Sequence, residues 1–383
     1  MKSKPIAKFS KIRVAVVTDW MATPGGSDRL MEQLLKLFPQ AAIFTSYYNR
    51  KAYQGTFAEN YEVKTSFIQK MPFVRSLHRH YNVFTPLAFE SFDFTGYDLV
   101  ISLSAGAAKG VITKVDQPHI SIILTPQRSL WDQESNVRGS RFRFFYKLAS
   151  PFIANYMRSW DIAAFQRADL HLSISKYIAD KVRKVYRADS EVLYPGIDEC
   201  WFGNEMRRPN QYLPKSYFLV VSRLYDYKRI DWAIEACKKA RKNLLIVGDG
   251  PDRRYLEKKA GNSKFINFLG WVDDLELKYL YKNAKALIFP GVEDFGYTPI
   301  EAMALGTPQV ALREGGVKET VVEGKTGEFF ESQEELCEKL AKFSKLKYNE
   351  KEIVRNAKRF SESQFQKNFI KYLNQLKLYA EEK

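Results

Sequence analysis

Residues 289–306 read FPGVEDFGYTPIEAMALG, and this stretch decides the fold. The apolar run Ala286–Pro290 leads into it and is bounded by proline and glycine, which predicts a short buried strand. Gly296 opens a turn, and Pro299 suits the first position of a helix, where the missing proline N–H costs nothing. The segment therefore predicts a strand, a loop and a helix in direct succession.

Two glutamates, Glu293 and Glu301, stand eight positions apart around this helix start. The unpaired N–H groups near Gly296, Tyr297 and Thr298 attract phosphate through their donors and the helix dipole. Glu293 precedes the turn and Glu301 is expected in the first helical turn, so both can face one ligand. Paired carboxylates beside an anion site are explained if each binds hydroxyl groups of an attached sugar or ribose. Alternatively, Glu301 is a helix-start acid and Glu293 a solvated loop residue.

This strand, loop and helix with its E-x7-E spacing resembles the signature of family 4 glycosyltransferases, which are retaining enzymes of the GT-B fold. The resemblance extends over most of the chain. It implies an α/β architecture of two doubly wound Rossmann-like domains that face each other across a cleft. It also implies that Glu301 holds ribose hydroxyls and Glu293 the transferred sugar, with the backbone N–H groups of Phe295 and Gly296 touching that sugar.

Length and composition predict a folded, two-domain protein. The chain has 383 residues, of which 45% are hydrophobic and 14% aromatic, which is ample for sizeable cores. No apolar run reaches the roughly 18–20 residues of a membrane span, and no signal-peptide core follows the basic N-terminus. Cys200, Cys237 and Cys337 are widely spaced and form no metal pattern, which fits a reducing cytosol. We therefore expect a cytoplasmic protein.

The net charge of +16 concerns the partners of the chain rather than its fold. Nucleic acid, an anionic membrane surface and anionic small substrates are the three candidates, and no nucleic-acid-binding motif is visible. Basic residues alternate with aromatic ones in 64–81 and in 138–147, a composition that suits the surface of an anionic leaflet. Alternatively, these aromatic residues are core and the cations only solvate the outer face. We expect no nucleic-acid partner and consider peripheral binding to the inner membrane face.

Strand-like and helix-like segments alternate along the chain, as in α/β proteins with parallel sheets. We expect an acceptor-side domain at 1–203, a polar linker at 204–216, a nucleotide-sugar-binding domain at 217–360 and a C-terminal helix at 361–383 that packs back on the first domain in the resembled fold. The expected strands are Arg13–Thr18, Asp98–Leu103, Ile120–Leu124, Leu170–Ile174, Glu191–Tyr194, Tyr217–Ser222, Asn243–Gly248, Ile266–Leu269, Ala286–Pro290 and Gln309–Leu312. The expected helices include Ser27–Leu37, Lys176–Tyr186, Ile230–Ala240, Asp252–Lys259, Leu275–Asn283, Pro299–Leu305 and Glu334–Ser344.

Cationic and glycine-containing loops follow the strands of the second half. Arg223 and Lys228, five positions apart in one loop, can both point at one diphosphate, although two basic loop residues can equally face solvent. Their match to the family's R-x4-K pair favours the diphosphate. Gly248 and Gly250 resemble the family's loop beneath the nucleotide, although a plain turn is the alternative. Val272 stands at the family's position for base contact. Two neighbouring features are assigned no ligand: Asp273 is expected to cap the next helix, and Gly315–Gly316 resembles a mainly structural loop.

Two loops of the first half complete the expected site. Gly25 and Gly26 enter a helix after the first strand, where glycine lets the backbone approach a ligand closely. In the resembled family this loop lies near the diphosphate and the acceptor. The alternative is a plain turn between strand and helix without a ligand. The segment 124–132 resembles an active-site loop of the mannosyltransferase branch, which leaves Arg128 and Asp132 as polar candidates. This chain has Leu124 where that branch usually has histidine, which puts the donor, the acceptor or the activity in doubt.

The resemblance implies a retaining hexosyltransferase of polysaccharide biosynthesis, with catalytic roles for Arg223, Lys228 and Glu293. GDP-mannose is the first candidate for the donor, UDP-sugars are the alternative, and the acceptor is a glycan or lipid-linked saccharide. No cofactor is expected. No divalent metal is expected either, because the cations and the helix end supply the positive charge. The alternative function is a non-catalytic protein of the same fold that binds a nucleotide sugar or a membrane.

Overall fold

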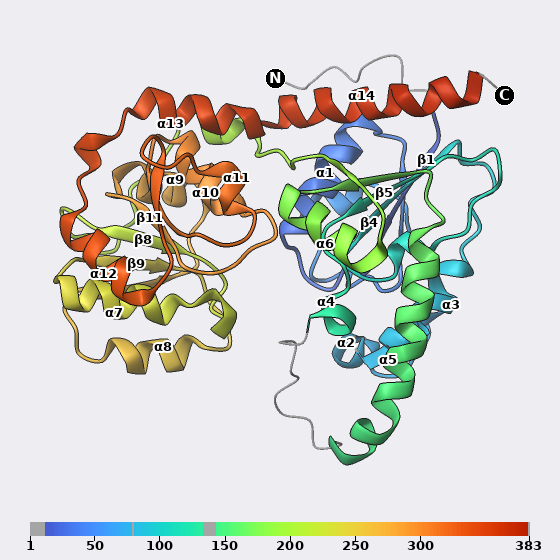
Figure 1. Ribbon diagram of the computed structural model, residues 1–383, viewed down its shortest axis with the longest axis horizontal. Coiled ribbons are helices and arrows are strands. Elements are labelled where there is room, and N and C mark those ends of the chain that lie inside the picture. Colours follow the sequence, from blue (N-terminus) through green and yellow to red (C-terminus); the bar gives the residue numbers. More distant parts are fainter. Residues whose placement is uncertain (1–11, 79, 133–142, 382–383) are drawn as a thin grey trace. The chain divides into compact units, whose positions relative to one another are not determined.

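A computed structural model describes residues 12–78, 80–132 and 143–381 and divides the chain into two units (Figure 1). Unit 1 comprises Met1–Tyr194 and Gln366–Lys383, and unit 2 comprises Pro195–Phe365. Each unit is built around one parallel β-sheet, so the expected pair of doubly wound Rossmann-like domains is confirmed. Among the helices of these described ranges, none has both the length and the apolar composition needed to cross a bilayer.

The sheet of unit 1 has seven strands in the order β3-β2-β1-β4-β5-β6-β7. Its interior strand β1 is entirely buried, as expected for a parallel strand with helices on both faces. Val16 of β1 lies in register with Ile43 of β2 and Ile101 of β4, so the apolar side chains form continuous rows. The strands are β1 (Val14–Thr18), β2 (Ala42–Thr45), β3 (Val63–Thr65), β4 (Leu99–Ser104), β5 (His119–Ile123), β6 (Leu170–Ser173) and β7 (Glu191–Val192).

The helices of unit 1 follow the carboxyl ends of these strands. In the first of them, Leu30, Leu34 and Leu37 recur at helical spacing and are buried, whereas Lys36 faces outward. The α-helices are α1 (Gly26–Leu37), α2 (Val74–Leu77), α3 (Thr85–Glu90), α4 (Arg128–Trp131), α5 (Arg143–Phe165) and α6 (Lys176–Tyr186). Short 3-10 helices are η2 (Phe57–Asn60), η3 (Phe67–Lys70), η4 (His80–Phe84) and η5 (Ala108–Gly110).

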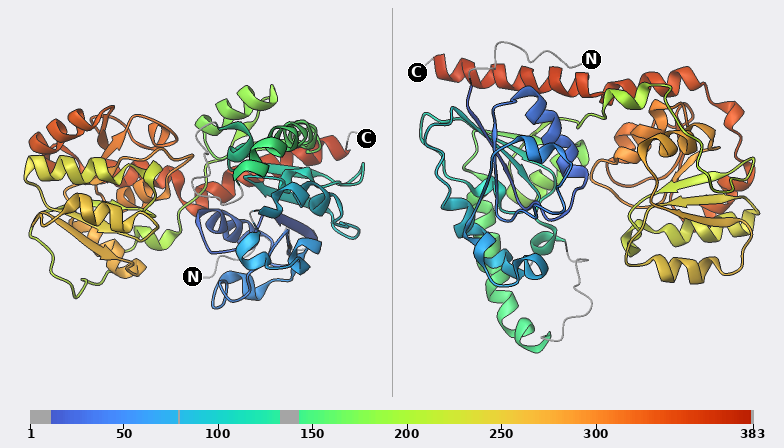
Figure 2. Two further views of the ribbon diagram at one scale, coloured as in Figure 1. Left: turned by 90° about the horizontal axis from the view of Figure 1, so that it is seen from below. Right: turned by 180° about the vertical axis from the view of Figure 1, so that it is seen from behind.

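The sheet of unit 2 has six strands in the order β10-β9-β8-β11-β12-β13. Its core combines strand residues such as Val220 and Ile246 with helix residues such as Ile234 and Leu336, all of them buried. Helices lie on both faces of this sheet (Figure 2). The strands are β8 (Phe218–Val221), β9 (Leu244–Val247), β10 (Ile266–Gly270), β11 (Leu287–Phe289), β12 (Gln309–Leu312) and β13 (Gly327–Phe330).

Side-chain caps fix several helix starts in unit 2. Ser332 accepts a hydrogen bond from the N–H of Glu335, and Asp273 accepts one from the N–H of Glu276, as expected for helix N-caps. The α-helices are α7 (Ile230–Ala240), α8 (Arg253–Ala260), α9 (Asp274–Asn283), α10 (Tyr297–Ala304), α11 (Val317–Thr320), α12 (Gln333–Lys342) and α13 (Glu350–Ala357). The 3-10 helices are η6 (Glu199–Phe202), η7 (Asp226–Lys228), η8 (Lys345–Lys347) and η9 (Lys358–Phe360).

The last helix, α14 (Glu362–Glu381), begins in unit 2 and continues in unit 1. Its apolar stripe has Phe365 in unit 2 and Phe369 and Leu373 in unit 1, and all three side chains are buried. The ring of Phe369 packs edge-on against Phe38, which follows α1, with 6.3 Å between the ring centroids. The part of α14 after Phe365 therefore contributes Phe369 and Leu373 to the core of unit 1.

The boundary between the units lies nearer the N-terminus than the expected limit at residue 203. Residues 195–203 belong to unit 2 because their backbone is held there. The N–H of Ile197 donates to the carbonyl of Phe360 at 2.8 Å, and the N–H of Glu362 donates back to Ile197 at 2.9 Å. The ammonium of Lys278 donates to the carbonyl of Cys200 at 2.6 Å. Arg207, in the segment expected to be a linker, pairs with Asp273 at the start of α9.

Candidate functional site

The helix after β11 begins two residues earlier than expected. Gly296 is its N-cap, with a φ of +92° that favours glycine, and Tyr297 is its first residue. Pro299 is therefore the third helical residue, which a proline tolerates because first-turn N–H groups have no partner within the helix. Glu301 is the fifth residue and lies in the second turn. The expectation that Pro299 opens the helix and that Glu301 lies in its first turn was wrong.

Two of the three expected catalytic side chains are in contact. The ammonium of Lys228, at the end of η7, pairs with the carboxylate of Glu293 in the loop after β11. Gly291 allows this approach, because a Cβ at that position would lie 2.9 Å from the Cα of Lys228. The loops that follow β8 and β11 thus bring a cation and a carboxylate together at the carboxyl edge of the sheet.

The glycines of the loop after β9 permit close packing against the loop after β8. Gly248 has a φ of +117°, and a Cβ there would lie 2.0 Å from the carbonyl oxygen of Ser222. A Cβ on Gly250 would lie 2.4 Å from the carbonyl oxygen of Leu224. Close packing of the two loops therefore requires glycine at both positions. The contact of Gly248 and Gly250 with a donor stays a prediction. Arg223, between the two packed positions, is exposed.

Glu301 points into the protein. Its side chain is buried, and the carboxylate accepts a hydrogen bond of 3.0 Å from the hydroxyl of Tyr281 in α9. Phe295 is also buried, and its ring packs edge-on against Tyr297 and Phe360. The side chain of Phe295 is therefore a core element, and only its backbone remains as a predicted contact of the sugar. The predicted role of Glu301 toward a ribose also stays a prediction.

The strand end at β10 and the loop after β12 complete this edge of unit 2. Val272 is buried, whereas its neighbour Trp271 is 80% exposed. The N–H of Gly316 donates to the carbonyl of Glu293 at 2.9 Å, so the second glycine loop holds the backbone of the Glu293 loop. Asp273 caps α9 as expected. Within the described ranges, no group of three or more His, Cys, Asp or Glu side chains is arranged to hold a metal ion.

In unit 1, Gly25 and Gly26 start α1. The N–H of Gly25 donates to the carboxylate of Asp28 at 2.6 Å, and the other oxygen of Asp28 accepts from the hydroxyl of Tyr53 at 2.8 Å. The N–H of Gly25 is therefore directed at a protein carboxylate, whereas Gly26 is exposed. The loop is held in place by Asp28, a residue that the sequence analysis did not select.

The helix α4 is the helical turn of the expected active-site loop. It begins at Arg128, and Asp132 directly follows its last residue. Arg128 is exposed, and the carboxylate of Asp132 lies 3.8 Å from the ammonium of Lys181 in α6. The guanidinium of Arg158 in α5 donates to the carbonyl of Leu130 at 2.8 Å. Side chains from two neighbouring helices thus fix the position of this turn.

Asp161, near the C-terminal end of α5, organises the carboxyl edge of unit 1. Its fully buried carboxylate accepts hydrogen bonds from Lys109 at 2.5 Å, Trp131 at 2.8 Å and Tyr186 at 2.8 Å. These donors come from η5, α4 and α6, so one carboxylate connects three elements. The available sequence signal was weak: Lys109 is the single charge within 105–111, a run of small and apolar residues.

A second buried carboxylate, Asp19, holds the loop after β4. It accepts hydrogen bonds from the N–H groups of Ala105 at 2.6 Å and Ala108 at 2.8 Å. Burial raises the pKa of Asp19 above its ordinary value, and the hydrogen bonds of the two backbone N–H groups oppose that shift. Gly106 leaves room for the carboxylate, because a Cβ there would meet it at 3.1 Å. Asp19 therefore stabilises the loop that also carries Lys109.

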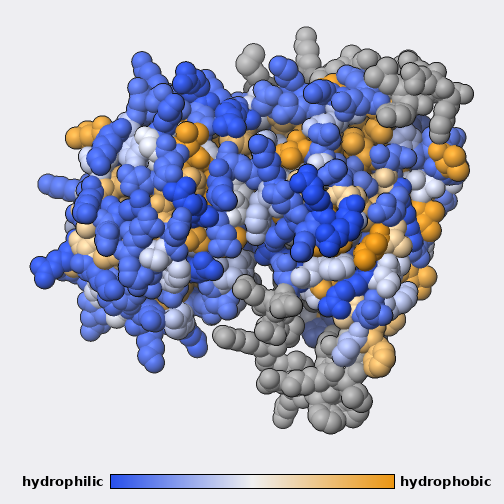
Figure 3. Space-filling model, viewed as in Figure 1, coloured by the Kyte–Doolittle hydropathy of each residue, from blue (hydrophilic) through white to orange (hydrophobic). Residues whose placement is uncertain are grey.

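Exposed aromatic side chains occur on both basic stretches or next to them. Phe73, just before α2, is 79% exposed, and Phe152 in α5 is 80% exposed, with Tyr156 exposed one turn later. Figure 3 shows apolar side chains among hydrophilic ones over the α5 side of unit 1. Residue 79 of the first stretch and residues 138–142 of the second lie outside the described residues.

The family assignment comes from the second half of the chain. Residues 203–360 match the model of the family "Glycosyl transferases group 1", and this region contains Arg223, Lys228, Glu293 and Glu301. This matched region, about two fifths of the chain, therefore has the sequence pattern of that glycosyltransferase family. The predicted GT-B resemblance is therefore confirmed at the level of the family.

Curated relatives match part of the chain. An uncharacterized glycosyltransferase of Methanocaldococcus jannaschii is 33% identical over 170 residues, which cover 39% of this chain and 44% of that protein. A GDP-mannose-dependent alpha-(1-6)-phosphatidylinositol monomannoside mannosyltransferase of Mycolicibacterium smegmatis is 30% identical over 184 residues, 42% of this chain and 48% of that protein. The matched regions thus span less than half the length of these relatives.

The chain shares its fold over nearly its whole length with solved structures. The sucrose-phosphate synthase of Thermosynechococcus elongatus superposes with a TM-score of 0.70 at 18% identity, and the alignment covers 96% of this chain and 100% of that one. At this identity the likeness concerns the fold alone. It agrees with the GT-B architecture of two parallel-sheet units.

Proposed function

We propose that this chain is a hexosyltransferase that moves a hexose from a nucleoside diphosphate sugar to a hydroxyl group of a glycan or lipid-linked saccharide, with retention at the anomeric carbon. The observation that carries this proposal is the contact between Lys228 and Glu293, inside the region that matches the family model. A cation suited to a diphosphate and a carboxylate suited to sugar hydroxyls lie side by side there, as one bound sugar nucleotide requires.

In this proposal, the bond between the anomeric carbon and the phosphate oxygen breaks, and a bond to the acceptor oxygen forms on the same face. Arg223, Lys228 and the first N–H groups of α10 stabilise the charge that develops on the departing diphosphate. One preorganised donor of this kind typically contributes about 3–4 kcal/mol, or roughly a hundred- to thousandfold in rate. Glu293 orients the sugar through its hydroxyls, and the departing phosphate accepts the proton of the acceptor.

Donor binding would exchange the partners of the Lys228–Glu293 ion pair. The pair already neutralises both groups, and the side chain of Glu293 is partly exposed. A bound donor offers phosphate oxygens to Lys228 and hydroxyl donors to Glu293, so each group regains a partner when the pair separates. No metal takes part in this proposal, because Arg223, Lys228 and the helix end provide the positive charge that the diphosphate needs.

GDP-mannose is the proposed donor. The support comes from Asp19–Trp20, from the loop at 124–132 and from residues 289–296, which resemble the mannosyltransferase branch. The Mycolicibacterium smegmatis relative, whose name includes GDP-mannose, adds to this support. Leu124 departs from the histidine of that branch and lies half-buried directly after β5. A UDP-sugar donor is the alternative within the same reaction.

We also propose that transfer takes place at an anionic membrane surface where the acceptor is lipid-linked. The exposed rings of Phe73, Phe152 and Tyr156, together with the net charge of +16, support peripheral binding. The second candidate function is a non-catalytic protein that binds the nucleotide sugar without turning it over. Leu124 in place of histidine favours this candidate.

A thermal-shift series with GDP, UDP, GDP-mannose and UDP-glucose tests the proposal, since a ligand that binds the folded state raises the melting temperature. We expect stabilisation by the diphosphates, loss of that stabilisation in Arg223→Ala/Lys228→Ala, and its retention in the exposed control Lys351→Ala. Absence of any shift, or an unchanged shift in the double variant, would contradict the proposal. Stabilisation without transfer or hydrolysis of the donor would instead support the non-catalytic candidate.

A further inference from the structure

A pocket of about 480 Å³ lies in unit 1. It is at the opposite edge of the unit 1 sheet from the loops that contain Gly25 and Arg128. Four of its lining residues lie just before four neighbouring strands: Arg13 directly before β1, Ala41 directly before β2, Glu62 directly before β3 and Tyr97 two residues before β4. Because the strands are parallel, this edge carries their amino ends, whereas the expected transfer site uses their carboxyl ends. The pocket is therefore separate from the proposed transfer site.

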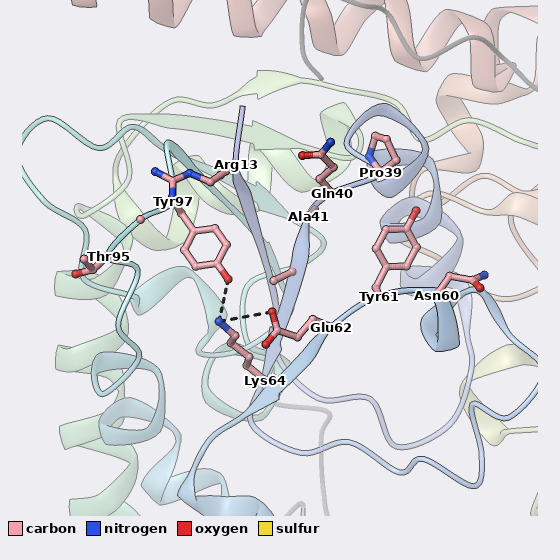
Figure 4. Close-up of a pocket in the computed structure, with 12 residues that line it drawn as sticks. Arg13, Pro39, Gln40, Ala41, Asn60, Tyr61, Glu62, Lys64, Thr95 and Tyr97 are labelled. Atoms are coloured by element: carbon pink, nitrogen blue, oxygen red, sulfur yellow. Dashed lines mark hydrogen bonds and ion pairs between the residues drawn. The ribbon is translucent and has the colours of Figure 1, made fainter. Parts of the chain in front are cut away.

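Two tyrosine rings form opposite sides of this pocket (Figure 4). Tyr97 is fixed by the ammonium of Lys64, which donates to its hydroxyl at 3.0 Å, and by edge-on packing against Phe44. The hydroxyl of Tyr61 donates to the carbonyl of Leu35 at 3.2 Å. The hydrogen bonds hold both hydroxyl groups in place, so the ring faces are positioned before any ligand binds.

The charges of the pocket are balanced. Arg13 lies 3.7 Å from the carboxylate of Asp98, and Lys64 lies 3.7 Å from the carboxylate of Glu62. A phosphate or nucleotide site needs a surplus of positive charge, which two neutralised cations do not provide. An anion is therefore a poor fit, and an uncharged polar ligand is a good one.

The remaining polar groups suit a ligand rich in hydroxyls. Gln40 and Asn60 are exposed at the rim, and each primary amide offers two N–H donors and one carbonyl acceptor. Within the part of the chain that the structure describes, no side-chain partner is recorded for either amide. Aromatic faces beside a few convergent polar groups, in a volume of a few hundred Å³, are typical of a small-ligand site.

We infer that this pocket binds a neutral oligosaccharide of about one to three sugar units. The ring faces of Tyr61 and Tyr97 would contact the C–H faces of the sugars, and Gln40, Asn60 and Glu62 would bind their hydroxyls. This second glycan site goes beyond the proposed transfer reaction, because it lies at the amino edge of the sheet. It would retain a glycan chain while the reaction proceeds at the other edge.

Ligand-observed saturation-transfer NMR on the full chain tests the inference, with maltotriose, α-1,6-mannobiose and N,N′-diacetylchitobiose as probes. We expect at least one probe to bind, with affinity reduced about tenfold or more in Tyr61→Ala. Gln40→Ala/Asn60→Ala should give the same direction of change and, because both residues are exposed, an unchanged melting temperature. The matched control Tyr212→Ala, an exposed tyrosine of unit 2, should bind as the unaltered protein does.

Saturating GDP and UDP separate this site from the transfer site. Binding of the probe should persist in their presence and in Arg223→Ala/Lys228→Ala, even if those variants disprove the proposed transfer function. The inference is overturned if none of the three probes binds. It is also overturned if binding disappears with a nucleoside diphosphate, or if Tyr61→Ala and Gln40→Ala/Asn60→Ala both change the affinity less than twofold.

Discussion

Two lysine–carboxylate pairs, Lys109–Asp161 in unit 1 and Lys228–Glu293 in unit 2, differ in burial. In unit 1, the side chains of Lys109 and Asp161 are 2% and 0% exposed. In unit 2, those of Lys228 and Glu293 are 10% and 34% exposed. A fully buried pair cannot lose a partner without leaving a charge in the interior, whereas a partly exposed pair can exchange partners with a ligand. The first pair therefore holds loops in place, and the second is suited to binding.

The largest effect is expected from breaking the buried pair. Lys109→Met leaves the carboxylate of Asp161 buried without its cation, which should lower the free energy of unfolding by about 3–5 kcal/mol. Urea denaturation measures this change. Arg183→Ala is the control, because the Arg183–Asp189 pair is exposed and should contribute less than about 1 kcal/mol. Equal losses in both variants would abolish the distinction between buried and exposed pairs.

The complementary test concerns turnover rather than stability. Arg223→Ala/Lys228→Ala should lower the turnover number at saturating donor by roughly a hundred- to thousandfold, because the charge on the leaving diphosphate loses its cations. A loss of less than tenfold would contradict the assigned roles. Circular dichroism of the same variant should show the fold retained, which separates a lost interaction from unfolding.

A smaller loss of stability is expected when one hydrogen bond to Asp161 in unit 1 is removed. Trp131→Phe keeps an aromatic ring but removes the N–H that donates to Asp161, which should cost about 1.5 kcal/mol. Hydrogen exchange of the amides at 130–132 should accelerate, whereas the affinity for nucleoside diphosphates should stay the same. Unchanged exchange would show that the bond to Asp161 does not hold α4.

The pH dependence should also differ between the units. All four histidines lie in unit 1, and burial lowers the pKa of His119 to about 3 and that of His171 to about 4. The unfolded chain binds protons at these imidazoles below about pH 6.5, but the folded chain does not, so stability should fall as the pH falls from about 6.5 toward 4.

Each imidazole should contribute about 1.4 kcal/mol per pH unit within this window. His119→Gln should remove one such contribution, and urea denaturation at pH 6.5, 5.5 and 4.5 measures the slope. Asp19 titrates in the opposite sense, because burial raises its pKa. Asp19 is present in both the unaltered protein and His119→Gln, so its contribution cancels when their slopes are subtracted. An identical slope in the variant would mean that His119 does not titrate on unfolding.

Long elements with a clear apolar pattern could be predicted from the sequence. The expected bounds of α6 and α7 agree with the structure at both ends, and the five expected strands of each half are present. Three strands, β2, β3 and β13, were missed. Their length is not the reason, because β7 with two residues and β11 with three were expected. The pairing of these strands depends on neighbours that are distant in the sequence.

The helix α5 was missed for another reason. Its start at Arg143 falls in a stretch that was interpreted by composition, as a basic and aromatic surface, and Pro151 lies inside it. Proline in a helix interior is unfavourable, so the pattern argued against one continuous helix. The hydrogen-bond network around Asp161 was missed with the helix. Its partners are 25, 30 and 52 positions away in the sequence, and spacing gives no sign of such contacts.

The loops of the candidate site in unit 2 were predicted because motif residues follow the strands that place them. The contact of Lys228 with Glu293 spans 65 positions, yet both residues belong to recognisable loops. The burial of Glu301 could not be predicted. It depends on Tyr281, a residue of α9 whose orientation follows from packing rather than from local sequence.

The course of the chain through α14 has a consequence for the order of folding during synthesis. The ribosome completes residues 195–365, all of unit 2, before it adds Phe369 and Leu373, which pack into unit 1. The unit whose synthesis starts first is thus the last whose core can close. Until then, the surface around Phe38 that receives Phe369 stays uncovered in the nascent chain. A stop codon near position 365 would leave it uncovered permanently.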